Sequence, residues 1–254
     1  MSRSNPSENA VNPSSRFIEW SGSEGKFKYF DKTKGEKGEN VFIELPFYFL
    51  PLDQLSTCKG YDEKAGLGFY SNEIRNTKTD MLTIRTKNGI IMSGLYENCK
   101  EKLASRGLDY VQSVYVAIKE GKDYVLANLQ LKGSALGPYI EFCKGKKMSE
   151  VGVSVKKANP MKKGATKYFE PVYEVMKVSD EANEIAIGLD KVLQEYLTPY
   201  LSKNASTIVA EEKLDESQNN GLNKTEPKTE FKKEKDIIHN ENNPFGDDDE
   251  LPAF

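Results

Sequence analysis

Apolar and polar residues alternate along much of the chain, and this period of two predicts β-strands rather than helices. The pattern appears in the segments 17–20, 27–29, 41–50, 81–86, 90–92, 110–119, 123–132, 151–155 and 168–178. Glu120-Gly121-Lys122 separates two of the longest segments and favours a tight turn, so residues 110–132 are expected to form a β-hairpin. A second hairpin is expected between residues 151 and 178.

Helical spacing appears in shorter stretches. Leu95, Cys99 and Leu103 recur every four residues, which predicts a short helix that ends near Gly107. Residues 133–144 suit a short helix or a loop, and residues 52–76, which contain several glycines, suit a loop. Ser179 is a good N-cap residue and precedes an apolar stripe over residues 185–197, so a C-terminal helix is expected before Pro199.

Composition indicates an ordered part joined to polar segments. Apolar residues are 37% of the 254 residues and charged residues are 30%, whereas globular domains usually have about 45–50% apolar residues with Gly included. We expect a disordered N-terminus (1–15), one domain (16–201), and a disordered linker with an acidic C-terminal tip (202–254). The domain is expected to be mainly β, a β-barrel with inserted short helices and a C-terminal helix, and the oligonucleotide-binding (OB) fold is the leading candidate.

Several classes of protein are not expected from this sequence. The three cysteines are widely spaced and His239 is the single histidine, so neither a disulfide framework nor a metal site is expected. The phosphate-loop, HExxH and GxSxG motifs are absent. No apolar run approaches the roughly 20 residues of a membrane span, and no secretory signal is recognisable. We therefore expect a cytoplasmic, non-enzymatic protein without a cofactor or catalytic residues.

Charge divides the chain into two parts. Residues 203–254 carry thirteen acidic and seven basic residues, so their net charge is −6, while the whole chain carries −3. The remaining body is therefore mildly basic, at +3. Opposed charges of this kind are common in nucleic-acid-binding proteins and in proteins with an interaction tail.

A lysine-rich hairpin is the first candidate nucleic-acid-binding element. Residues 144–167 hold eight lysines and one acid, Glu150, and the lysines flank a loop expected over residues 158–166. Lysines can neutralise phosphates and exposed aromatic rings can stack on bases, which suits single-stranded nucleic acid. A solvated, solubilising loop is the alternative interpretation. The candidate residues here are Lys156, Lys157, Lys162, Lys163, Lys167 and Tyr168.

A second candidate element alternates lysines with aromatic residues over residues 26–34. In a strand, Phe27 and Tyr29 would share the core face, whereas Lys26, Lys28 and Phe30 would share the other. Phe30 is therefore the better candidate for base stacking. Arg85 and Lys87, on the strand expected over 81–86 and the turn after it, are weaker candidates for DNA binding. Trp20, the single tryptophan, is expected in the core.

The C-terminus is the most distinctive feature of the sequence. Four consecutive acids precede a small apolar tip, an arrangement that suits a basic pocket with an apolar base. A solubilising tail is the alternative, but it does not explain an apolar tip after the acids. The candidate partner-binding residues are Asp247, Asp248, Asp249, Glu250, Leu251, Pro252 and Phe254.

This ending resembles the C-terminal tip of bacterial single-stranded DNA-binding proteins, and the lysine-rich hairpin makes the chain look more like the phage replication proteins of that type. Glu250 and Ala253 depart from the usual pattern of aspartates, an aliphatic residue, Pro and Phe. The resemblance implies a protein of the host cytoplasm that coats single-stranded DNA without sequence preference in replication, recombination and repair. It also implies an acidic tail that recruits replication proteins, and the opposite charges of tail and body suggest that the tail competes with DNA.

Two points stay open at this stage. A non-enzymatic interaction protein or virion-associated protein with an acidic docking peptide is the alternative function. The oligomeric state, monomer or dimer, is also open, because the stripe over residues 185–197 suits packing on its own domain or on a partner.

Overall fold

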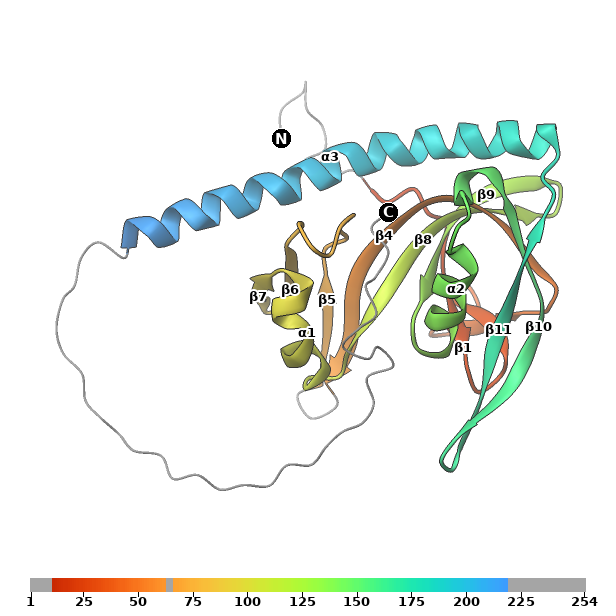
Figure 1. The fold of residues 1–254 in the computed structure, drawn as a ribbon, viewed down its shortest axis with the longest axis horizontal. Coiled ribbons are helices and arrows are strands. Elements are labelled where there is room, and N and C mark those ends of the chain that lie inside the picture. Colours follow the sequence, from red (N-terminus) through yellow and green to blue (C-terminus); the bar gives the residue numbers. More distant parts are fainter. Residues whose placement is uncertain (1–10, 63–65, 219–254) are drawn as a thin grey trace. The chain divides into compact units, whose positions relative to one another are not determined.

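The computed structural model describes residues 11–62 and 66–218, with side chains described up to residue 202. Strands dominate the fold (Figure 1). They are β1 (Arg16–Ser21), β2 (Lys26–Asp31), β3 (Glu39–Ile43), β4 (Phe47–Asp62), β5 (Leu67–Ser71), β6 (Leu82–Thr86), β7 (Gly89–Gly94), β8 (Leu108–Glu120), β9 (Asp123–Leu131), β10 (Gly152–Lys163) and β11 (Thr166–Met176). The α-helices are α1 (Tyr96–Ala104), α2 (Leu136–Cys143) and α3 (Asp180–Gln218).

The strands form one mixed sheet that does not close on itself. Its main path runs in the order β3-β2-β1-β9-β8-β4-β5-β6-β7, and β10 joins β4 while β11 pairs only with β10. β1 and β9 are parallel, and the other pairs are antiparallel. The domain is therefore mainly β with a C-terminal helix, as the alternation of residues predicts.

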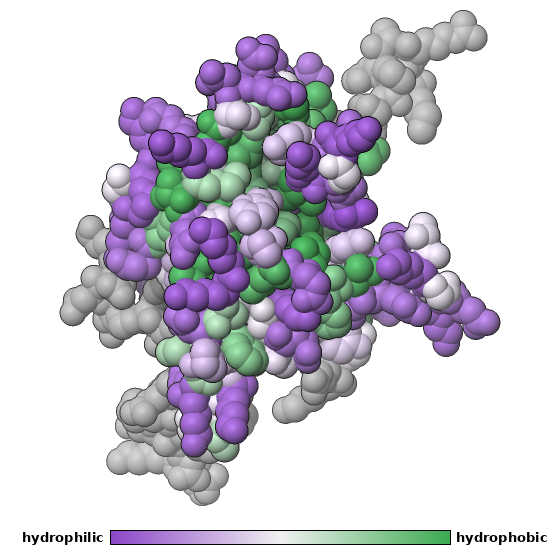
Figure 2. Space-filling view, turned by 90° about the vertical axis from the view of Figure 1, so that its right-hand side faces the viewer, coloured by the Kyte–Doolittle hydropathy of each residue, from purple (hydrophilic) through white to green (hydrophobic). Residues whose placement is uncertain are grey.

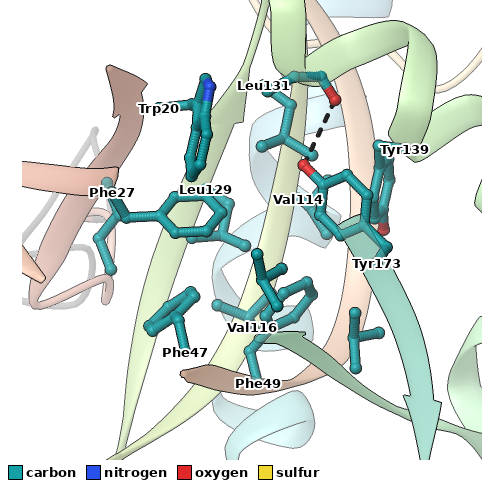
Figure 3. Packing of buried hydrophobic residues seen from close by; sticks show 14 of the residues in the cluster. Trp20, Phe27, Phe47, Phe49, Val114, Val116, Leu129, Leu131, Tyr139 and Tyr173 are labelled. Atoms are coloured by element: carbon teal, nitrogen blue, oxygen red, sulfur yellow. Dashed lines mark hydrogen bonds between the residues drawn. The ribbon is translucent and has the colours of Figure 1, made fainter. Parts of the chain in front are cut away.

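The main core lies on one face of this sheet, the inner face. Aromatic side chains from β1, β2 and β4 follow one another there, with ring centroids 4.9 Å apart for Trp20 and Phe27 and 4.8 Å apart for Phe27 and Phe47 (Figure 3). Helix α2 covers this core, and Tyr139 packs against Tyr173 of β11. The expectation that Trp20 is a core residue is confirmed, because it is only 9% exposed.

A smaller core lies under the strands that follow β4. It joins the end of β4 and the start of β8 to β5, β6 and helix α1, and its buried residues are Cys58, Phe69, Ile74, Leu82, Ile84, Cys99, Leu103 and Leu108. Two of these, Cys99 and Leu103, belong to the four-residue spacing that predicts α1. This part of the chain widens the sheet beyond the main core.

Helix α3 packs on the opposite face of the sheet, the outer face, over β4, β8 and β9. Leu193 and Leu197 are fully buried against Leu55, Tyr115 and Leu126. Most of the stripe expected over residues 185–197 therefore packs on its own domain, whereas Ile185 and Val192 are exposed.

Polar contacts also hold α3. Arg75 donates two hydrogen bonds of 2.8 Å to Asp53, and Gln194 of α3 donates one of 2.9 Å to the same carboxylate. Burial alone would raise the pKa of Asp53, but these hydrogen bonds outweigh it and hold the pKa below its ordinary value.

The structure differs from the sequence-based expectation in four segments. The loop expected over residues 52–76 is wrong, because β4 continues to Asp62 and β5 follows. The loop expected over 158–166 is also wrong, because the two strands continue to a turn of two residues at Gly164 and Ala165. Helix α3 continues through Pro199 to Gln218. At the N-terminus, Ser15 donates backbone and side-chain hydrogen bonds of 2.8 Å to Leu126, so this residue is held against the sheet.

Within the described residues, none of the helices has the length and apolar character that a membrane span requires.

Candidate nucleic-acid interface

Three exposed aromatic rings lie together on the outer face of β1, β2 and β3. Phe17, Phe30 and Phe42 are 47%, 53% and 44% exposed, whereas Phe27 of the inner face is fully buried. Ile18 is paired with Tyr29, so the register places Phe17 opposite Phe30. Phe42 is paired with Lys28, which makes it the diagonal neighbour of Phe30. The three rings therefore form one exposed aromatic group around Phe30.

The same face continues across the sheet to β4, β5 and β6. The Nζ atom of Lys59 lies 5.6 Å from the centroid of the Phe17 ring. Lys59 is paired with Tyr70 of β5, and Tyr70 is paired with Arg85 of β6, so these side chains share a face. We call this series of residues the outer-face strip. Its members are Phe42, Phe30, Phe17, Lys59, Tyr70 and Arg85.

Lys59 is the least exposed cation of the outer-face strip. Burial lowers its pKa, and the neighbouring Glu73 and Glu19 carboxylates offset only part of this effect. Tyr70 is 49% exposed and Arg85 is exposed. The outer-face strip thus combines rings that can stack on bases with cations that can pair with phosphates.

A row of side chains along β2 connects this strip to the turn between β1 and β2. Lys28 and Lys26 lie on the same side of β2 as Phe30, as the alternation predicts. Lys26 is 2.7 Å from Glu44, so part of its charge is neutralised within the domain. Lys28 is therefore the stronger of the two candidates.

The ends of β10 and β11 form a second element, which we call the hairpin arm and define as residues 156–171. β10 leaves β4 after Val155, and beyond this point the arm is a two-stranded ribbon. Its distal end is the lowest coloured part of the ribbon drawing (Figure 1), and the view from the right shows hydrophilic residues that project at the lower edge (Figure 2).

Hydrogen bonds at Phe169 fix the root of the arm. Its backbone N–H donates to the carbonyl of Gly22 at 2.8 Å, and its carbonyl accepts from Trp20 Nε1 and Ser134 Oγ at 3.0 Å each. Gly25 has φ +65°, and a Cβ atom there would lie 3.0 Å from the Phe169 ring. The arm is therefore attached firmly to the turn at which the β2 row ends.

The lysines of the arm differ in how they are paired. Lys156 lies 3.0 Å from Glu174, which raises the lysine's pKa. Lys157, Lys162, Lys163 and Lys167 are exposed and have no ion-pair partner in the part of the chain that the structure describes. Tyr168 is half-buried and faces Met161 across the arm. The charge available for a ligand is thus concentrated toward the tip.

The sequence-predicted residues lie in four parts of the chain. Phe30 and Arg85 lie in the outer-face strip, and Lys26 and Lys28 lie beside it. The arm carries the five predicted lysines and Tyr168. Lys87 lies at the turn between β6 and β7, beyond the last residue of the strip. The predicted tail residues 247–254 lie outside the described residues, as does His239.

Four residues of the strip were not candidates from the sequence. They are Phe17, Phe42, Lys59 and Tyr70. The alternation around Ile18 could have placed Phe17 on the outer face, but its position beside Lys59 depends on the pairing of β1 with β9, of β9 with β8 and of β8 with β4. The pairing of β1 with β9 joins segments more than a hundred residues apart and has no local signal.

A polar cluster with catalytic residue types lies under the loop that follows β5. Ser113 and Tyr115 both donate hydrogen bonds to the Glu73 carboxylate, and the backbone N–H of Glu73 donates to Tyr200 of α3 at 2.9 Å. Ser113 and Tyr115 are fully buried, and burial raises the pKa of Tyr115. These contacts join the loop, the sheet and α3, which is a structural role.

No set of three or more His, Cys, Asp or Glu side chains that could hold a metal ion occurs among residues 11–62 and 66–202, whose side chains are described. Comparison with known proteins found no matching family model, and no significant match among curated proteins or solved structures.

Proposed function

We propose that this protein binds single-stranded DNA without sequence preference and protects it during replication, recombination and repair. The observation that supports this most strongly is the outer-face strip, in which rings and cations from six strands lie on one face of the sheet. Phe30 and its two neighbouring rings would stack on successive bases. Lys28, Lys59 and Arg85 would contact the intervening phosphates.

The chemistry of the strip explains why binding would not depend on the base sequence of the DNA. Every base has an aromatic face, and stacking on a ring contributes about 1–3 kcal/mol per base whatever its identity. Lysine and arginine contacts to phosphates depend on salt and not on base sequence. A duplex hides the faces of its bases, so it could use the phosphate contacts but not the rings.

We also propose that the domain is a variant of the OB fold. The main core lies on the inner face of the sheet, and it is covered by helix α2, which lies between β9 and β10 in the chain. The hydrogen bond from Phe169 to Gly22 holds β11 beside the turn between β1 and β2. A contact of this kind would connect the two sides of a partly open barrel. The additional strands β5, β6 and β7 with α1 would then be an insertion that lengthens the binding face.

The acidic tail has two proposed roles that follow from its composition. Residues 247–254 would recruit replication and recombination proteins through charge and an apolar tip. The tail would also compete with DNA for the lysines of the domain, because it carries the same sign of charge as DNA.

Fluorescence anisotropy with a labelled oligo-dT strand tests the proposed function. Tight binding is expected at low salt, with a linear fall of log K against log salt of about 0.7 per phosphate contacted. An unlabelled duplex should compete poorly. Absence of binding at low salt would refute the proposal and favour an interaction or virion-associated protein that uses the tail as a docking peptide.

A further inference from the structure

The tip of the hairpin arm has a charge arrangement that is unfavourable for the arm alone. Lys162 and Lys167 are directly opposite each other on the two strands, and Lys163 is the next residue. Like charges at opposite positions destabilise a β-ribbon. No acid faces these three lysines within the described residues, although Glu174 pairs with Lys156 near the root. A polyanionic ligand at the tip would remove this repulsion.

The lysines point to both faces of the ribbon. Alternation places Lys162 and Lys167 on one face, and Lys163 on the other. A single strand that follows one face could pair with only part of this charge. A duplex groove has phosphates on both sides, so a ribbon that enters it can use lysines on both of its faces.

The dimensions of the arm suit the major groove. Six residue pairs, from Ala158 with Pro171 to Lys163 with Thr166, form the distal ribbon, which is therefore roughly 20 Å long. The major groove is about 12 Å wide and admits a two-stranded ribbon. Gly164 has φ +59° at the turn, which lets the two strands join through only two residues and keeps the tip narrow.

An apolar pair lies immediately behind the lysines. Met161 is 40% exposed and is paired with Tyr168, one residue pair nearer the body than Lys162 and Lys167. The last base pair of a duplex exposes one flat apolar face toward its single-stranded extension. Met161 and Tyr168 can cover that face while the lysines beyond them contact the duplex phosphates.

We propose that the hairpin arm binds the duplex that flanks a single-stranded segment, so that the preferred DNA is a junction between single and double strand. This inference rests on the proposed function, because the outer-face strip holds the single strand of the same junction. The β2 row with Lys28 runs from Phe30 toward the turn that fixes the arm, and it supplies the path between the two elements.

Anisotropy titrations of the full chain with three labelled DNAs test the inference: an oligo-dT strand, a blunt duplex, and the duplex with the same dT strand as its tail. The wild type should bind the tailed duplex about tenfold more tightly than the dT strand. The variant Lys162→Gln/Lys163→Gln/Lys167→Gln should lose this preference. For the tailed duplex, the slope of log K against log salt should become smaller in magnitude by about 2 to 3. Its affinity for the dT strand should stay within about twofold of the wild type.

A matched control removes three exposed lysines elsewhere. The variant Lys119→Gln/Lys122→Gln/Lys177→Gln should keep the preference for the tailed duplex. Equal losses on the dT strand and the tailed duplex in the arm variant would overturn the inference, because the arm would then bind the single strand. A wild type without any preference would also overturn it.

The two proposals fail separately in this experiment. Lack of dT binding by the wild type refutes single-strand binding, whatever happens at the arm. Normal dT binding without a contribution from the three arm lysines on the tailed duplex refutes the junction inference alone. Thermal unfolding of each variant confirms that the exposed substitutions leave the fold intact.

Discussion

Replacement of Phe30 by alanine should weaken single-strand binding without unfolding the domain. The ring is 53% exposed and lies over Gly38, whose Cβ position would be 2.5 Å from it, so the ring covers backbone and does not fill the core. Truncation of a buried Phe costs about 3–5 kcal/mol. We expect about half of that or less here, because half of the side chain already contacts water.

The effect on DNA binding should be larger than the effect on stability. Loss of one stacking contact of about 1–3 kcal/mol corresponds to a decrease in affinity of about 5- to 150-fold. The salt dependence of binding should not change, because phenylalanine contacts no phosphate. Phe30→Trp should restore most of the affinity, since its larger ring can still stack. These three results together would identify stacking.

The assay is anisotropy of a labelled oligo-dT strand, measured at several salt concentrations with the full chain. Ile187→Ala is the control, because Ile187 lies on α3 and is 49% exposed, close to the value for Phe30. It should leave the affinity unchanged. A change of less than about twofold for Phe30→Ala, or a change in its salt slope, would refute the stacking role.

Three further predictions concern the tail, an ion pair and a close contact. Deletion of residues 247–254 should leave oligo-dT affinity unchanged or increased, and a large loss in the same titration would refute competition between tail and DNA. Asp53→Asn should lower the melting temperature near pH 7, because the Arg75 guanidinium loses its charged partner. The pKa of Asp53 is lowered by folding, so its contribution is present above about pH 4 and disappears as the pH falls below that. The variant should therefore approach the wild type at low pH, and a constant difference in melting temperature would contradict this. Gly25→Ala should destabilise the domain by about 1–3 kcal/mol in urea unfolding, since it combines a positive φ with a contact on the Phe169 ring; a neutral result would show that the root of the arm adjusts.

Local patterns predicted the strands well where burial alternates along a single strand. Phe27 and Phe30 are a good example, because the period of two assigns one to the core and the other to the surface. The region after Leu52 failed for a tertiary reason. Gly60 suggests a loop in isolation, but a Cβ atom there would lie 2.3 Å from the carbonyl oxygen of Gly107, so the strand needs glycine for a close approach to the segment that begins β8.

The strands of the distal arm were not predicted from the sequence, for a different reason. Pro160 is unusual inside a strand, yet β10 has an open edge beyond Val155, and a missing N–H is tolerated at an edge. The outer-face strip could be predicted only in part. Phe30 and Arg85 have local signals. The position of Lys59 beside Phe17, in contrast, depends on the order of the strands in the sheet.

The parallel pairing of β1 with β9 has a consequence for how the chain folds. Ser15, just before β1, bonds Leu126, which is 111 residues further along the chain. Contacts of such long sequence separation close slowly, because the entropy of a large loop is lost before they form. During synthesis, β1, β2 and β3 can form only a local three-stranded antiparallel unit until β9 has left the ribosome. The main core is then completed late, and β10 must still join β4 before the hairpin arm acquires its fixed root.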